Sequence, residues 1–183
     1  MICAQVLIVA WMLTRIGLRS RIVAVLLALV VLVPVHGVSP AMALRGLWGD
    51  PSITTLQLLV LALVGTTRPA VRGGWCAPAL IALLAAALNA SALGPWNIDL
   101  YRFGYQPAAL VAALGAIALI AWWRGHPLYL WLLAIDLIAW RSGWLESTNL
   151  WDALLDPLLM FAMLALALSN GFRAYHNRQT LPA

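Results

Sequence analysis

The sequence predicts an all-α fold, a polytopic bundle of transmembrane helices, and three observations lead to this fold class. The first is composition: of 183 residues, 64% are hydrophobic and 9% are charged, whereas soluble proteins contain about 25% charged residues. The second is a series of long uncharged windows, and the third is the way charge alternates between the segments that separate them. Together they predict seven spans, with the N-terminus outside and the C-terminus inside, or six spans plus an interfacial N-terminal helix.

Seven uncharged windows follow one another along the chain, and each is a candidate span. A helix that crosses a membrane needs about 20 largely apolar residues, within a range of about 17–25. Five windows reach this length or nearly reach it. The sixth reaches it if Asp136 lies inside the span, and the first reaches it if Arg15 and Arg19 extend their side chains to the interface. The windows are residues 1–14, 22–44, 51–67, 73–98, 103–123, 125–135 and 157–172.

The charged residues between the windows predict the orientation. With the N-terminus outside, the cytoplasmic side receives Arg15, Arg19, Arg21, Arg68, Arg72, Arg124, Arg173 and Arg178. The outer side receives Arg45, Arg102 and Arg141, and also all the acids outside the spans, which are Asp50, Asp99, Glu146, Asp152 and Asp156. Membrane proteins carry their excess of basic residues on the cytoplasmic side, and this rule holds here through every loop. If residues 1–14 lie in the interface, six spans remain and both ends are inside.

The predicted domain organisation follows from these spans. Residues 1–172 form a single transmembrane bundle, and residues 173–183 form a short polar tail in the cytoplasm. The first segment lacks the basic start and the small-residue cleavage site of a secretory signal, so we expect it to remain in the protein. We therefore expect a multi-pass protein of a bacterial-type inner membrane, whose function lies in the bundle, at its two faces or on a partner.

The composition also excludes several functions. The sequence contains no lysine, which excludes a retinal Schiff base and pyridoxal chemistry. It has no phosphate-binding glycine loop, and its histidines do not predict a haem or metal site, because His36 lies outside whereas His126 and His176 lie inside. The net charge of +5 favours anionic lipid over nucleic acid as the partner of the arginines. We therefore expect the lipid bilayer as a partner, and no cofactor, metal or nucleic acid.

Two similar motifs at the predicted outer face form the main candidate site. Residues 45–50, RGLWGD, and residues 141–146, RSGWLE, both follow the pattern R-x-x-W-x-[D/E] at the outer end of a span. A third polar stretch, residues 95–107, contributes Asp99 and Arg102 between aromatic residues. The candidate ligand-binding residues are Arg45, Trp48, Asp50, Asp99, Arg102, Asp136, Arg141, Trp144 and Glu146.

The outer loops that carry these motifs admit three interpretations. Tryptophan side chains seat at the headgroup level, and an arginine–carboxylate pair lets a loop fold back without an unpaired charge, so the pattern favours interfacial anchoring. The same groups are also suited to a converging site for a small molecule or a lipid headgroup, or to docking of a membrane-protein partner.

Asp136 is the most informative single residue, because it lies within an apolar segment, LYLWLLAIDLIAW. An ionised carboxylate costs about 3 kcal/mol in the middle of a membrane-spanning helix. Asp136 is therefore a candidate proton or cation site, or the partner of an arginine. Arg141 lies at an unfavourable angle on the same helix, so Arg45 or Arg102 is the expected partner. Over these roles we favour a carboxyl group that is neutral or paired and hydrogen-bonded between helices.

Three classes of function remain open. We favour a non-catalytic subunit or assembly partner of a larger membrane complex, because the loops are short and no catalytic constellation is visible. The second class is a small-molecule transporter or substrate-binding component. With six spans, both ends inside and polar outer loops, the predicted architecture resembles the vitamin-binding S-components of energy-coupling-factor transporters, which implies a substrate site at the outer face. The third class is a membrane enzyme acting on a lipid-linked substrate, with Asp50, Asp99, Glu146 or Asp152 as acid/base groups.

Overall fold

The computed structural model describes residues 2–65, 74–92 and 99–179, and in these ranges the protein is all-α, which confirms the expected class. There are also two short 3-10 helices. η1 (Leu29–Leu32) directly follows α2, and η2 (Tyr101–Gly104) lies just before α6. Arg68 and Arg72, expected on the cytoplasmic side, lie outside the described residues. The helices are α1 (Ile2–Ile16), α2 (Arg21–Ala28), α3 (Pro40–Trp48), α4 (Ile53–Val64), α5 (Cys76–Ala92), α6 (Ala108–Trp123), α7 (Leu128–Arg141), α8 (Leu150–Leu154) and α9 (Pro157–Gln179).

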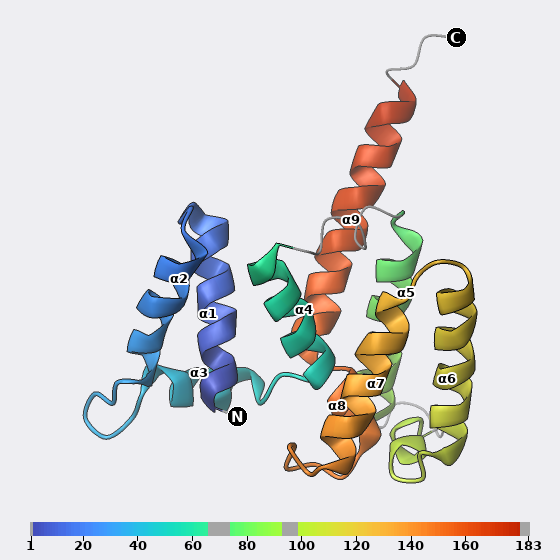
Figure 1. Ribbon diagram of the computed structural model, residues 1–183, viewed down its shortest axis with the longest axis horizontal. Coiled ribbons are helices and arrows are strands. Elements are labelled where there is room, and N and C mark those ends of the chain that lie inside the picture. Colours follow the sequence, from blue (N-terminus) through green and yellow to red (C-terminus); the bar gives the residue numbers. More distant parts are fainter. Residues whose placement is uncertain (1, 66–73, 93–98, 180–183) are drawn as a thin grey trace.

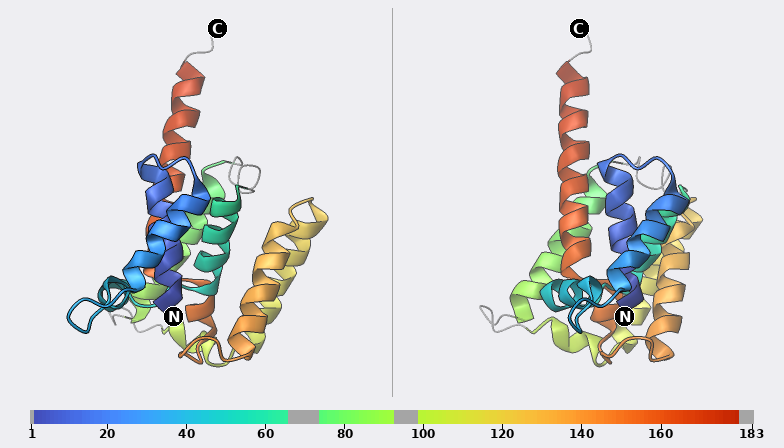
Figure 2. Two further views of the ribbon diagram at one scale, coloured as in Figure 1. Left: turned by 60° about the vertical axis from the view of Figure 1, so that its left-hand side comes forward. Right: turned by 90° about the vertical axis from the view of Figure 1, so that its left-hand side faces the viewer.

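The longer helices run side by side, and the chain reverses direction between them (Figure 1). The short helix α3 lies across one end of the bundle, where η2, α8 and the start of α1 are also found. We call this the capped end. The end of α9 at Gln179 lies at the opposite end, and Figure 2 shows that α9 extends past the ends of the other helices there. Segments far apart in the sequence therefore meet at the capped end.

Serine caps and glycines set where several helices begin and end. Ser20, Ser39 and Ser52 precede α2, α3 and α4, and each hydroxyl accepts the backbone N–H of the residue three positions on. Such a cap satisfies one of the donors that a helix start leaves unpaired. Gly65 ends α4 in the left-handed conformation, with φ of 88°, which glycine adopts without a steric penalty. Ser39, Ser52 and Gly65 lie inside uncharged windows, so the window 22–44 contains a second helix start and α4 is shorter than the window 51–67.

The expected span over residues 22–44 is split into two helical segments. The first ends with η1 at Leu32, and Pro34 follows, which has no N–H to continue a helical ladder. The chain then turns through His36 and Gly37, both with positive φ, before α3 begins. The apolar character of this window therefore does not correspond to one continuous helix.

One helix in the described ranges, α9, is long and apolar enough to cross a membrane, over Pro157–Asn177 with a mean hydropathy of 1.4. The other apolar helices contain 10–17 residues. At about 1.5 Å per residue, even the longest of these reaches about 26 Å, less than a hydrocarbon layer of about 30 Å. Seven spans, or six with an interfacial first helix, are therefore not confirmed. The expected polar tail also begins within a helix, because α9 continues through Arg173 to Gln179.

The helices pack in pairs, and α4 lies between two of them. α1 packs along α2, α5 along α9, and α6 along α7. The main core lies around α8, where the Leu150 side chain is fully buried and Trp151 is nearly so. A smaller cluster that includes Val6 and Leu63 connects the α1–α2 pair to α4. Because α4 also contacts α7 and α8, it connects the α1–α2 pair to the α6–α7 pair and to α8.

Candidate functional site

The capped end begins with α3, which Gln5 of α1 holds in place. The side chain of Gln5 is fully buried. Its Nε2 donates to the Gly49 carbonyl oxygen at 3.3 Å, and its Oε1 accepts from the Trp48 indole N–H at 3.0 Å. Both ends of the buried amide are thus satisfied, as buried polar groups require. Trp48, which the sequence predicts as an interfacial anchor, also ties α3 to α1.

Arg45 joins the two sequence motifs of the outer loops. Its Nη2 lies 2.9 Å from Asp50 Oδ2 and 2.7 Å from Glu146 Oε1. Asp50 belongs to the same motif as Arg45, whereas Glu146 belongs to the second motif, between α7 and α8. Hydrogen bonding to Glu146 and the charge of Asp50 raise the pKa of Arg45 above its ordinary value, so the guanidinium stays charged. The structure thus brings three of the candidate residues into one ion-pair cluster.

The remaining candidates of the outer loops lie apart from this cluster. Arg141 is exposed and forms no ion pair within the described ranges, and Trp144 is 68% exposed. The second motif therefore contributes only its acid. Asp99 accepts the backbone N–H of Arg102 at 3.2 Å, which caps the turn that leads into η2. Residues 95–98 of the third polar stretch lie outside the described residues.

Asp156 connects the starts of two helices. It is buried between α8 and α9. Its Oδ1 accepts the Leu159 N–H at 2.7 Å, which caps α9, and its Oδ2 accepts the Ser52 N–H at 2.6 Å and the Thr55 hydroxyl, both at the start of α4. A carboxylate is stabilised by the partial positive charge at a helix N-terminus, and here two N-termini converge on one carboxylate. We call Asp156, Ser52 and Thr55 the Asp156 cluster.

A second set of hydrogen bonds holds η2 against α8. The Tyr101 hydroxyl donates to Asp152. Burial of the ring is the larger cause, and this hydrogen bond the second, that raises the pKa of Tyr101 above its ordinary value. The fully buried Asn149 caps α8 by accepting the Trp151 N–H at 2.9 Å, while its Nδ2 donates to the Tyr101 carbonyl at 3.0 Å. The Trp151 indole donates to the Leu100 carbonyl at 3.1 Å. The loop before α6 is therefore bound at three points.

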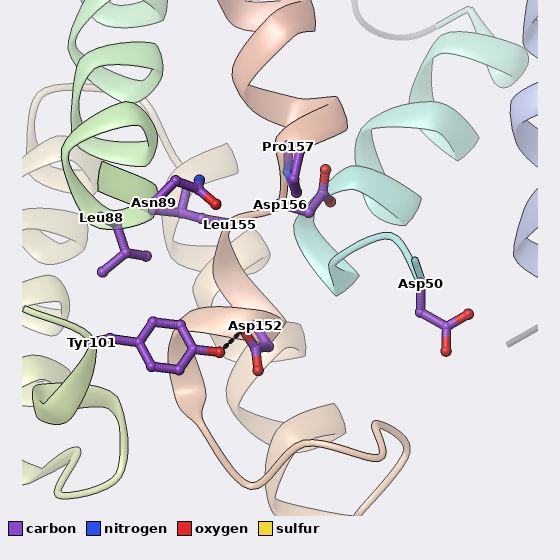
Figure 3. Close-up of a pocket in the computed structure, with 8 residues that line it drawn as sticks. All are labelled: Asp50, Leu88, Asn89, Tyr101, Asp152, Leu155, Asp156 and Pro157. Atoms are coloured by element: carbon purple, nitrogen blue, oxygen red, sulfur yellow. Dashed lines mark hydrogen bonds between the residues drawn. The ribbon is translucent and has the colours of Figure 1, made fainter. Parts of the chain in front are cut away.

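These groups surround a cavity of about 290 Å³ at the capped end (Figure 3). Its volume is close to the lower limit of small-ligand pockets, about 300 Å³. Its carboxylates already have hydrogen-bond or ion-pair partners. Asp50 pairs with Arg45, Asp152 accepts from Tyr101, and Asp156 accepts from the residues of the Asp156 cluster. The lining residues are Asp50, Leu88, Asn89, Tyr101, Asp152, Leu155, Asp156 and Pro157.

Asp136 lies away from the cavity residues, between α7 and α4. Its side chain is 2% exposed. The Thr54 hydroxyl donates to Oδ2 at 2.8 Å, and Gln57 Nε2 donates to Oδ1 at 2.7 Å and also to the Leu132 carbonyl at 3.1 Å. The expectation that Arg45 or Arg102 pairs with Asp136 is wrong, whereas the favoured interpretation, a carboxyl group hydrogen-bonded between helices, is confirmed. Neutral donors on α4 satisfy this carboxyl group instead, and Asp136 therefore links two helices.

Several residues that build the site were missed by sequence reasoning, although one signal was present. Polar residues crowd the start of the window 51–67, which is otherwise apolar, and a polar side chain in an apolar segment generally hydrogen-bonds to a neighbouring helix. No comparable signal in the sequence indicates which residues they contact. The residues missed are Gln5, Ser52, Thr54, Thr55, Gln57 and Asn149.

No protein family, curated protein or solved structure matches this chain.

Proposed function

We propose that the protein is a multi-pass membrane protein whose helices form a lipid-embedded bundle, with the N-terminus outside and the C-terminus in the cytoplasm, and that it serves as a non-catalytic subunit or assembly partner of a larger membrane complex. The observation that carries this proposal is the surface of the helices, which differs from that of a water-soluble protein. Large apolar side chains are exposed along the described helices as well as buried in the core, and the buried polar side chains are hydrogen-bonded within the protein.

Exposed apolar side chains are found on nearly every helix. Ile22 on α2 is 75% exposed, Leu83 on α5 is 67% exposed and Phe161 on α9 is 62% exposed. Soluble monomers rarely expose apolar patches of more than a few hundred Å², about 300–600 Å² at most. Gln5 and Asp136, by contrast, are buried and hydrogen-bonded. A lipid environment accounts for both halves of this pattern, because lipid covers apolar surface and requires polar groups to be satisfied internally.

The packing of α9 supports the same environment. Only 11% of its apolar window over Pro157–Asn177 is buried inside the protein. The core helix of a soluble protein would be mostly buried, and α9 instead presents an apolar surface on most sides. A helix of this kind is stable where lipid or another protein covers it.

A partner is supported by α6, which is apolar on all sides. Its one buried residue is Ala118, and it packs mainly against α7. Its exposed face carries Ala109, Ala112, Ala113 and Ala116, which recur at helical spacing. Small residues let the backbone of a second helix approach closely, which is how helices associate in lipid. This face therefore fits a transmembrane helix of a partner protein.

The experiment is native mass spectrometry of the protein extracted gently from its own membrane. We first expect the protein to stay in the membrane fraction after carbonate extraction. In the mass spectrum we then expect a stable mass far above 19.8 kDa, which dissociates into this chain and a second polypeptide in a fixed ratio. Ala112→Phe and Ala116→Phe should release the second polypeptide, whereas Ala86→Phe, an equally exposed alanine on α5, should retain it. A monomer in every preparation would refute the subunit proposal.

A second candidate function is supported by the cavity, which suits a substrate-binding component. The test is whether the same mass spectrum shows a monomer with a discrete small adduct. Asn89→Trp would fill the cavity from its α5 wall and remove the adduct, whereas Ala86→Trp, one turn earlier on the same helix, would leave it. An adduct that survives Asn89→Trp does not occupy this cavity, which would contradict this second candidate.

A further inference from the structure

We infer that the bundle thins the bilayer around it and selects phospholipids with short acyl chains as its annular partners. This inference rests on the proposed membrane embedding. It comes from three features of the described residues: the lengths of the apolar helices, the positions of the charges that limit them, and the contacts that keep two arginine side chains from reaching outward.

The apolar helices are uniformly short. α1 has 15 residues, α4 has 12, α6 has 16 and α7 has 14. At about 1.5 Å per residue these helices reach about 18–24 Å, whereas a typical hydrocarbon layer is about 30 Å thick. α5, with 17 residues, reaches about 26 Å.

The uncharged part of the longest helix conforms to the same limit, although the helix itself is longer. α9 has 23 residues, but its uncharged stretch ends at Phe172, because Arg173 follows. From Pro157 to Phe172 the helix covers about 24 Å. The end of the bundle opposite the capped end is therefore bounded by charge on several helices, and we call it the arginine end. Its described arginines include Arg15, Arg19, Arg21, Arg124 and Arg173.

The arginine end has no acid among the described residues, whereas all the acids except Asp136 lie at the capped end. Charge also marks the boundary of the apolar layer at the capped end, where Arg45 pairs with Asp50 and Glu146. Charged groups thus delimit the apolar layer from both sides. Phosphate groups at the arginine end match the charge of this surface.

Two arginine side chains at the arginine end are held at or within the level of the helix ends. The Arg15 guanidinium carbon lies 5.2 Å from the centre of the Trp11 ring, one turn back toward the capped end. The Arg21 guanidinium lies against Gly65 at the end of α4, so closely that a Cβ on Gly65 would be 2.4 Å from Nη1. Long basic side chains usually reach outward to the interface and so lengthen the apolar layer that a helix tolerates. These contacts oppose that adjustment.

The resulting difference in thickness is about 4–12 Å, and a bundle that is shorter than the hydrocarbon layer accommodates it by thinning the bilayer or by extending flanking side chains to the interface. Tilting a helix shortens its projection on the membrane normal and increases this difference. Thinning, or the recruitment of lipids with short chains, removes it. The apolar surface of this bundle therefore fits a thinner hydrocarbon layer.

The experiment reconstitutes the full chain into vesicles of dimyristoleoyl, dioleoyl or dierucoyl phosphatidylcholine, which differ in chain length, and measures the Tm from tryptophan fluorescence. We expect the highest Tm in dimyristoleoyl vesicles and a value about 5–10 °C lower in dierucoyl vesicles. A maximum in dioleoyl or dierucoyl lipid would overturn the inference. A chain that fails to enter vesicles, judged by carbonate extraction, would instead refute the membrane embedding itself.

A pair of variants tests whether the arginines set the thickness. R15L with R173L extends the uncharged stretches of α1 and α9, so the Tm maximum should move toward dioleoyl lipid. R15K with R173K keeps both charges and should retain the preference of the wild type. An unchanged preference in the leucine variant would overturn the role of these arginines. If the leucine variant does not fold, the chain-length series of the wild type and the lysine variant still decides the inference.

Discussion

The substitution Asp156→Asn tests the hydrogen bonding that joins α4 to α9. Asp156 is 7% exposed, and its carboxylate accepts the Ser52 N–H at 2.6 Å, the Leu159 N–H at 2.7 Å and the Thr55 hydroxyl. Asparagine has nearly the same shape and can still cap α9 through its single oxygen. Its amide NH2 group, however, would face two donors at the start of α4.

The magnitude follows from the bonds that are lost. Hydrogen bonds to a charged group contribute about 1.5–3 kcal/mol each, and D156N removes two of them while it leaves the buried Ser52 N–H without an acceptor. We therefore expect the free energy of unfolding to fall by about 3–5 kcal/mol. Asp152→Asn is a matched control, because Asp152 is only half-buried and loses one bond, from the Tyr101 hydroxyl. The expected loss for this control is about 1 kcal/mol.

The assay is equilibrium unfolding in mixed micelles, followed by the fluorescence of the ten tryptophans. A double-mutant cycle with Thr55→Val isolates the hydroxyl–carboxylate bond, and we expect the two substitutions to be non-additive by about 1–2 kcal/mol. The reasoning would be refuted if D156N were no more destabilising than D152N, or if D156N and T55V were strictly additive.

Three further predictions concern the capped end. Gly104→Ala should lower the Tm by overpacking, because a Cβ there would lie 1.7 Å from Asn149 Oδ1. Gly115→Ala, in the interior of α6 with no atom within 4 Å, should instead raise the Tm slightly, because alanine favours a helix over glycine. Arg45→Gln should destabilise the fold only slightly, and the difference from the wild type should disappear at high salt, since this ion-pair cluster is partly exposed. The pKa of Tyr101 is raised in the folded state, so the folded protein keeps the phenol proton to a higher pH than the unfolded chain does, and the free energy of unfolding should decrease as the pH rises above about 10. The difference in phenolate absorbance between the wild type and Tyr101→Phe measures the ionisation. A Tyr101 that ionises at the ordinary pKa of tyrosine would contradict the prediction.

The sequence predicted the all-α class and the grouping of Arg45 with acids at one end, because these depend on composition and on the spacing of charges along the chain. It overestimated helix length, since a hydropathy window counts Pro34 and Gly37 as compatible with an apolar span. Both residues interrupt the helical ladder without adding charge. Hydropathy therefore predicts which segments are apolar better than it predicts where a helix ends.

The partner of Asp136 was predicted wrongly for a different reason. The expectation assumed that an acid in an apolar segment needs a cation, but the hydroxyl of Thr54 and the amide of Gln57 provide two neutral donors. Which helix faces another, and in what rotation, depends on tertiary packing, which no pattern within one segment contains. The same is true of Gln5, whose amide contacts Trp48 and Gly49.

The polar start of α4 has a consequence for biogenesis. Thr54 contacts a residue 82 positions later in the chain, and Thr55 contacts one 101 positions later. In the multi-pass membrane protein proposed above, the hydrogen-bond partners of α4 would not yet be synthesised when α4 leaves the ribosome, so the segment would reach the membrane with unsatisfied polar groups that disfavour insertion. A nascent chain that ends before α7 should leave α4 accessible to protease, and completion of α7 and α9 should protect it. These hydrogen bonds therefore couple the start of α4 to helices from the second half of the chain, so folding of the first half depends on synthesis of the second.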